Sequence, residues 1–240
     1  TMTKLSVNIN KIATLRNSRG GNIPDVLKAA IDIQGFGADG VTVHPRPDER
    51  HIKYNDVIEI RRIIKTEFNI EGYPSPNFLE LVRRVKPHQV TLVPDPPEAI
   101  TSNAGWDTIS HQSFLQDVIG DLKENGIRTS IFIDTDPGLV KNAAKTNTDR
   151  VELYTEPYAS QYPEDRNKAI APFVEAAHIA HKAGLNINAG HDLNLENLKF
   201  FNEQIPFIKE VSIGHALISD ALYYGLEKTI SMYKELLIKE

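Results

Sequence analysis

The sequence of 240 residues contains no cysteine. It therefore has no disulfide framework, no thiolate metal site and no cysteine nucleophile. It also lacks an apolar run long enough to span a membrane, and no apolar signal core precedes its first strand-like segment. These absences suit a reducing compartment, and we expect a cytoplasmic protein that does not associate with membranes.

An excess of basic residues is absent as well. Lys and Arg number 27 against 32 Asp and Glu, which gives a formal net charge of −5. General nucleic-acid binding needs a basic footprint, so this charge argues against a nucleic-acid partner. With 40% hydrophobic residues the chain is too apolar to be disordered, and it is long enough for one α/β barrel or two small domains.

Short strand-like segments alternate with helical patterns along the whole chain. Eight segments are rich in Val, Ile or Thr or alternate apolar with polar residues: 4–10, 40–45, 69–73, 89–94, 128–134, 150–156, 186–191 and 210–215. Eight strand–helix units without a linker predict a single domain over residues 1–240, a (β/α)8 TIM barrel of the α/β class. A doubly wound open sheet is the alternative, which strand counting does not exclude.

Helix signals fill the gaps between these segments. Ser75 and Pro76 are typical of an N-cap and a first helical position, and apolar residues follow at helical spacing. A second stripe predicts a helix after Ser219; it comprises Leu222, Leu226, Ile230, Tyr233 and Leu237. The run GFGADG at residues 35–40 matches a dinucleotide-binding glycine pattern, but it follows a helix and opens a strand, so we interpret it as a helix end and tight turn.

Polar side chains collect where the predicted strands end, the edge at which barrels of this kind hold their active sites. They are Asn8, Asn10, His44, Glu71, Thr101, Asp134, Glu152, His191 and His215. In the first, second and sixth strands they alternate with Val, Ile or Leu on the opposite face, which predicts a polar face directed into the barrel. Burying such groups is costly unless they are paired or hydrated, so a functional pocket is the better explanation.

Three strand-end histidines, His44, His191 and His215, share this edge with Glu71 and Glu152. Imidazole beside carboxylate is suited to proton transfer near pH 7. A metal-dependent hydrolase or isomerase with the three histidines as ligands is the alternative, but the His-x-His signal common in barrels is missing from the first strand. No predicted strand core contains lysine, which argues against a Schiff-base aldolase.

Two loops are rich in cations. The loop after the first strand holds Lys11, Arg16 and Arg19, and the loop after the second holds Arg46, Arg50, His51 and Lys53. Guanidinium forks suit phosphate, and Gly214 with His215 before a helix resembles a backbone phosphate cradle. These features indicate two anionic ligands, each with a phosphate, and a non-catalytic binder of phosphate ligands is the alternative to an enzyme.

The motifs together resemble the pyridoxine 5′-phosphate synthase family. The matching stretches are VNINKIATLRNSRGG, GADGVTVHPRPDERHI, the strand with Glu71, KPHQVTLVPD with Thr101, RVELYTEPYA, NAGHDL and SIGHALI. The resemblance implies a homo-oligomer, an octamer, that condenses 3-amino-2-oxopropyl phosphate with 1-deoxy-D-xylulose 5-phosphate. The products are pyridoxine 5′-phosphate, phosphate and water, and the family needs neither a metal nor an organic cofactor.

The resemblance also implies roles for single residues. By their place in the motifs, His44, Glu71 and His191 correspond to the family's acid–base residues and Glu152 to its transition-state stabiliser. The amino-ketone phosphate site corresponds to Asn8, Arg19, Gly214 and His215. The deoxyxylulose phosphate site corresponds to Arg46, His51 and Thr101.

Two places depart from the family's pattern. Many members have Asp-His where this chain has Asn10 and Lys11, a pair that touches the deoxyxylulose substrate. Asn10 keeps an acceptor, whereas Lys11 keeps a donor but does not titrate near pH 7. Many members have Gly where this chain has Asp192, which is compatible with a backbone N–H contact only if φ is not positive.

Overall fold

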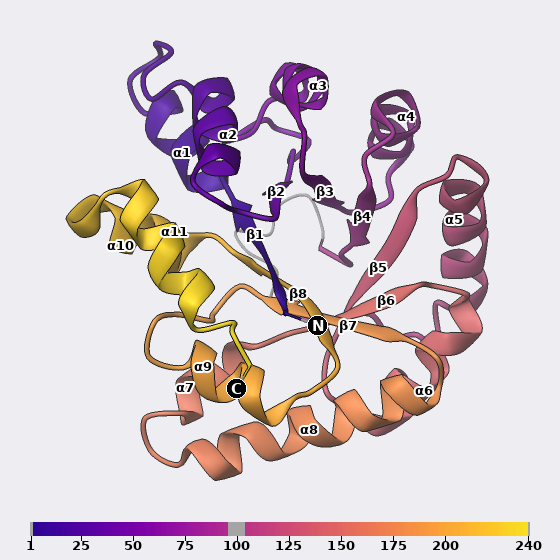
Figure 1. Cartoon of the computed structure of the whole chain (residues 1–240). Coiled ribbons are helices and arrows are strands. Elements are labelled where there is room, and N and C mark those ends of the chain that lie inside the picture. Colours follow the sequence, from indigo (N-terminus) through magenta and orange to yellow (C-terminus); the bar gives the residue numbers. More distant parts are fainter. Residues whose placement is uncertain (1, 96–103, 240) are drawn as a thin grey trace.

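The eight predicted strands form one closed parallel barrel in the computed structural model, which describes residues 2–95 and 104–239 (Figure 1). Each strand pairs with the next along the chain, and the last pairs with the first. The strands are β1 (Lys4–Asn8), β2 (Gly40–Val43), β3 (Glu67–Gly72), β4 (Gln89–Leu92), β5 (Arg128–Ile133), β6 (Arg150–Leu153), β7 (Asn186–Gly190) and β8 (Ile208–Ile213). This confirms the predicted barrel and removes the open sheet.

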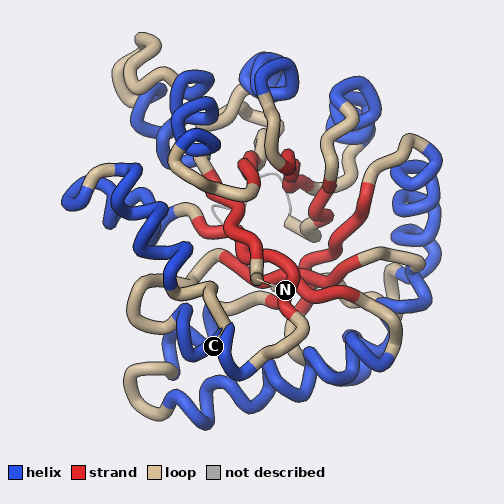
Figure 2. Tube along the Cα trace, viewed as in Figure 1, coloured by secondary structure: helices blue, strands red, loops and turns tan. Residues whose placement is uncertain are grey.

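Helices surround the barrel on its outside (Figure 2). They are α1 (Asn10–Asn17), α2 (Val26–Gly35), α3 (Tyr54–Ile63), α4 (Pro76–Val85), α5 (Gln112–Glu124), α6 (Pro137–Ala143), α7 (Glu156–Gln161), α8 (Arg166–Lys182), α9 (Leu198–Gln204), α10 (His215–Tyr224) and α11 (Leu226–Glu235), with a 3₁₀ turn at Ala144–Thr146. None of the helices in the described ranges is long and apolar enough to cross a membrane.

Local sequence signals explain where the helices begin. The Ser75 hydroxyl accepts a hydrogen bond from the N–H of Phe78, and Pro76 occupies the first turn of α4, as predicted. Asp25 and Asp136 cap α2 and α6 in the same way. The GFGADG run is a helix end, because α2 ends at Gly35 and Gly37 has φ +100° before β2 begins.

Two expectations about element boundaries were wrong. The first strand ends at Asn8, and Asn10 is already the first residue of α1. The apolar stripe after Ser219 does not form one helix, because Gly225 with φ +79° separates α10 from α11. Leu222 is consequently 76% exposed instead of buried, whereas Ile230 in α11 does reach the core.

The barrel interior is polar, as the alternation in the strands predicted. The hydroxyls of Ser6 in β1 and Thr42 in β2 hydrogen-bond to each other at 2.7 Å. The amide of Gln89 in β4 donates to the carboxylate of Glu210 in β8 at 3.3 Å. Strands β4 and β8 are not neighbours in the barrel, so this contact passes through its interior. The Val and Ile residues of the strands therefore pack outward against the helices.

Candidate active site

Two histidine–glutamate pairs lie at the C-terminal ends of the strands. Nδ1 of His44, the residue after β2, lies 3.9 Å from Oε2 of Glu71 in β3. Nδ1 of His191, the residue after β7, lies 3.5 Å from Oε1 of Glu152 in β6. The two carboxylates and His44 are buried, while the side chain of His191 is 29% exposed. The four residues predicted to be catalytic therefore come together as two pairs on neighbouring strands.

The surroundings shift the pKa values of three of these groups in directions that separate acid from base. Burial, together with the charge of Arg46, lowers the pKa of His44 well below its usual value. Burial raises the pKa of Glu71 to about 8. Burial lowers the pKa of His191, but the carboxylates of Glu152 and Glu71 outweigh it and raise this pKa to about 9. Near neutral pH the site thus holds a neutral imidazole beside two groups that carry protons.

A short chain of hydrogen bonds fixes the backbone at His44. The N–H of His44 donates to Oδ1 of Asn10 at 2.9 Å, and the N–H of Asn10 donates to Oδ1 of Asn8 at 2.9 Å. An aspartate at position 10 would accept the same bond, so the departure from the family's pattern preserves this contact. The neighbouring Lys11 is exposed at the start of α1.

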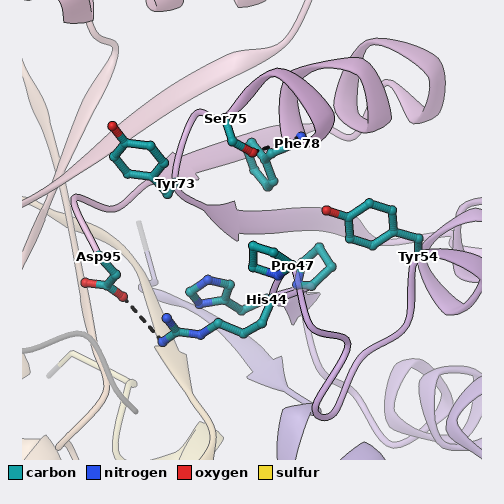
Figure 3. Close-up of a pocket in the computed structure, with 9 residues that line it drawn as sticks. His44, Pro47, Tyr54, Tyr73, Ser75, Phe78 and Asp95 are labelled. Carbon is teal, nitrogen blue, oxygen red and sulfur yellow. Dashed lines mark hydrogen bonds and ion pairs between the residues drawn. The ribbon is translucent and has the colours of Figure 1, made fainter. Parts of the chain in front are cut away.

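Arg46 and Asp95 form a buried ion pair beside His44 (Figure 3). Their closest nitrogen and oxygen atoms are 3.4 Å apart, and both side chains are at most 5% exposed. Nε of Arg46 has no hydrogen-bond partner among the described residues, which leaves a buried donor for a ligand. The pair borders a small pocket whose lining includes His44, Tyr54, Tyr73, Ser75 and Phe78.

His51 lies near His44, with 6.4 Å between the ring centroids. Its Nδ1 accepts a hydrogen bond from the N–H of Ile52 at 2.8 Å, so the neutral ring carries its proton on Nε2. Burial and the charges of Arg46 and Lys11 lower the pKa of His51 to about 4. Near neutral pH this residue therefore presents an uncharged N–H donor.

The expectation that Arg16 belongs to a phosphate-binding loop was wrong. Its guanidinium forms a bidentate ion pair with Asp56 in α3, at 2.7 and 2.8 Å, and its side chain is 5% exposed. It also donates to the carbonyl oxygen of His51 at 3.1 Å, and the Asn17 amide donates to the same oxygen at 2.8 Å. Arg16 therefore ties α1 to α3 and to the loop that carries His51.

The residues matched to the amino-ketone phosphate site are brought together only in part. Gly214 is the N-cap of α10, and a Cβ added to it would lie 3.0 Å from Cβ of Asn8. His215 is the first residue of α10 and is exposed. Arg19 is also exposed, and its side chain makes no hydrogen bond within residues 2–95 and 104–239.

The remaining predicted residues have mixed outcomes. Asp192 does not have a positive φ, whereas the preceding His191 has φ +44°, so the backbone admits Asp at position 192. Thr101 lies outside the described residues. Asp134 has a structural contact, because its carboxylate accepts the N–H of Gly105 at 3.2 Å. Among the side chains that the structure places, no three of His, Asp or Glu are arranged to hold a metal ion.

Sequence reasoning missed two contacts of the site. Asp95, the partner of Arg46, stands three residues beyond β4, and an acid at that edge of the barrel was a usable signal. Phe132 in β5 packs edge-on against the His191 ring, with 5.3 Å between centroids. Its type and position in an apolar strand carried no such signal.

Comparison with known proteins gives evidence on the family of this chain that is independent of the site geometry. Residues 5–239 match the model of a family described as pyridoxal phosphate biosynthesis protein PdxJ. Pyridoxine 5′-phosphate synthase from Parabacteroides distasonis is 64% identical over 97% of this chain and 98% of its own length. The synthase from Bacteroides thetaiotaomicron is 63% identical over 98% of this chain and 100% of its own length. Among solved structures, 3-keto-L-gulonate-6-phosphate decarboxylase from Vibrio cholerae aligns with a TM-score of 0.69. The alignment covers 99% of this chain and 98% of that one. Because the sequence identity is 11%, this similarity shows the fold alone.

Proposed function

The chain belongs to the PdxJ family of pyridoxine 5′-phosphate synthases, and from this premise we propose how its residues carry the reaction. The family condenses 3-amino-2-oxopropyl phosphate with 1-deoxy-D-xylulose 5-phosphate. An imine forms between amine and ketone, protons leave carbon, water and phosphate depart, and the pyridine ring closes. Each of these steps moves a proton to or from a positioned atom, and one domain spanning residues 1–240 performs them all.

The observation that carries the assignment is the difference in pKa between the two histidines, which is lowered for His44 and raised for His191. His44 is held neutral by burial and by Arg46, so its imidazole acts as the base that removes a carbon-bound proton. His191 is held protonated by the carboxylate of Glu152, 3.5 Å from its ring, so it acts as the acid that protonates a departing oxygen. Glu152 stabilises the imidazolium and any cationic intermediate beside it.

Glu71 links the two histidines. Its carboxyl lies 3.9 Å from His44, and when it loses its proton its negative charge raises the pKa of His191. With a pKa of about 8 it is mostly protonated at neutral pH and can take up or give a proton within the catalytic cycle. Because these groups interact, their titration in a pH–rate profile belongs to the cluster and not to single residues.

We assign the phosphate contacts to the two sets of residues that the family's motifs imply. The amino-ketone phosphate is bound by Asn8, Arg19, Gly214 and His215. The deoxyxylulose phosphate is bound by Arg46, His51 and Thr101, with Asn10, Lys11 and the backbone of Asp192 at the rest of the substrates. The buried free donor of Arg46 and the uncharged N–H donor of His51 support the second set.

The test supplies both phosphorylated substrates to the purified protein, with and without EDTA. Pyridoxine 5′-phosphate is followed by chromatography with fluorescence, and phosphate release is measured in parallel. We expect equal amounts of both products, the same with EDTA, and loss of turnover in His44→Asn. The control is His178→Asn on the exposed face of α8, which should keep full activity. Intact substrates with folded protein would refute the assignment.

We further propose a homo-oligomer, an octamer, located in the cytoplasm. Exposed apolar side chains support self-association: Leu15 of α1 and Leu222 of α10 are 56% and 76% exposed and border a common groove. Light scattering after size exclusion gives the mass directly, and Leu222→Glu should lower it. Cell fractionation tests the location.

A further inference from the structure

Thr155 uses its hydroxyl in an unusual way. It is the N-cap of α7, two residues beyond the end of β6, yet its side chain makes no capping bond to that helix. The fully buried hydroxyl instead donates to the carbonyl oxygen of Gly190 and accepts the N–H of Asp192 at 3.4 Å. A hydroxyl has one proton to donate and lone pairs that accept, and here both capacities serve the end of β7 and the turn that follows it.

The two residues that Thr155 contacts flank His191. That residue has φ +44°, in the left-handed region, which is unfavourable for a residue other than glycine. Such a conformation persists only where its surroundings hold it. On one side the N–H of His191 donates to the carbonyl oxygen of Ser212 in β8 at 3.1 Å. On the side of β6, the bonds to residues 190 and 192 come from Thr155.

The same strand end also supplies the charge partner of His191. Glu152 precedes Thr155 by three residues, and its carboxylate lies 3.5 Å from the His191 ring. One short segment of chain therefore fixes both the backbone of the acid and its electrostatic environment. Neither the family's motif assignments nor the acid–base chemistry above gives Thr155 any part.

We propose that Thr155 is a positioning residue for His191: its hydroxyl bridges Gly190 and Asp192 and so holds the imidazole in line with Glu152 and the substrate. The role assumes the acid function proposed above for His191. Thr155 itself touches no reacting atom. It acts by maintaining the strained backbone turn on which the acid stands.

The decisive comparison is Thr155→Val against Thr155→Ser. Valine keeps the shape but removes the hydroxyl and leaves the Gly190 carbonyl without this donor, whereas serine keeps the hydroxyl. A misplacement of about 1 Å in a catalytic group can cost about 10²-fold in rate, so we expect kcat to fall by about 10- to 100-fold in Thr155→Val, with KM for both substrates little changed. Thr155→Ser should restore most of the loss.

A second readout does not depend on turnover. The imidazole of His191, whose pKa is raised to about 9, can be followed by NMR in isotope-labelled protein. The titratable groups that act on its pKa are Glu152, Glu71, Asp192 and His44, and none of them is altered in the variants. In Thr155→Val the ring should move away from Glu152 and titrate at lower pH, and in Thr155→Ser it should titrate as in the unaltered protein.

Several outcomes would overturn the role. Unaltered kcat and titration in Thr155→Val would show that the bridge is dispensable. Equal impairment in Thr155→Ser and Thr155→Val would show that packing matters and the hydroxyl does not. If Thr155→Val fails to fold, Thr155→Ala removes the same hydroxyl without adding bulk. If the unaltered protein makes no product, the proposed function fails, and the NMR titration alone decides the positioning role.

Discussion

Replacing Glu71 by glutamine should stabilise the protein at alkaline pH while it strongly reduces turnover. The carboxyl is 1% exposed, and neither oxygen has a hydrogen-bond partner among the described residues. Burial raises its pKa to about 8, from 4.5 in the unfolded chain, with the Glu152 and Asp95 charges acting in the same direction and His191 opposing them. Ionising this group inside the barrel is therefore costly.

The sign of the pH dependence follows from proton binding. Between pH 4.5 and about 8 the folded protein keeps the Glu71 proton that the unfolded chain has released. Stability therefore falls as pH rises through this interval, and the whole contribution is lost above pH 8. At about 1.4 kcal/mol for each tenfold step, the loss amounts to at most about 5 kcal/mol. Glutamine does not titrate, so Glu71→Gln does not undergo this loss of stability.

Urea denaturation of both proteins from pH 5 to pH 9 measures the effect. The stability of Glu71→Gln relative to the unaltered protein should rise with pH by at least about 1.4 kcal/mol, one tenfold step. Glu175→Gln, at an exposed position on α8, is the control and should show no such rise. Turnover of Glu71→Gln should fall by at least about 10²-fold. Parallel pH dependence in the variant and the unaltered protein would refute the reasoning.

Three further changes have outcomes that the structure sets. Arg16→Met breaks the buried pair with Asp56 and should lower the free energy of unfolding by about 3–5 kcal/mol, measured by urea denaturation. The control Arg83→Met, at an exposed pair, should leave the denaturation midpoint nearly unchanged. His191→Asn should reduce turnover by at least about 10²-fold with an unchanged circular dichroism spectrum, and near-normal turnover would remove this residue from its role. Gly35→Ala places a methyl group in open space at the last residue of α2 and should raise stability by less than about 1 kcal/mol, visible as a slightly higher melting temperature. A lower melting temperature would contradict the helix-propensity argument.

The barrel and the grouping of the central residues followed from the sequence for a physical reason. Period-two alternation marked the strands, and consecutive strands of a parallel barrel are neighbours. Acidic and imidazole side chains at the ends of consecutive strands must therefore meet. This places His44 beside Glu71 and Glu152 beside His191, as the structure has them.

Contacts between helices and loops did not follow from the sequence. In the sequence, an arginine in a cationic loop gives the same signal whether its guanidinium binds a ligand or an acid. Arg16 forms an ion pair with Asp56, 40 residues away. Thr155 has a default local partner as a helix N-cap, and only the three-dimensional structure reveals that its hydroxyl turns to β7 instead. Gly225 lies within a regularly spaced run of apolar residues, yet its positive φ separates α10 from α11.

The Arg16 clamp has a consequence for anyone who redesigns this barrel. Loop grafting treats each strand-end loop as an independent module, but here the segments after β1 and β2 share one guanidinium and one backbone carbonyl. If only the segment after β2 were exchanged, the buried guanidinium of Arg16 would lose its hydrogen-bond acceptors. The transplantable unit therefore runs from α1 through α3, and libraries that diversify substrate preference should vary residues 18–25 and 45–53 together while keeping Arg16 and Asp56 fixed.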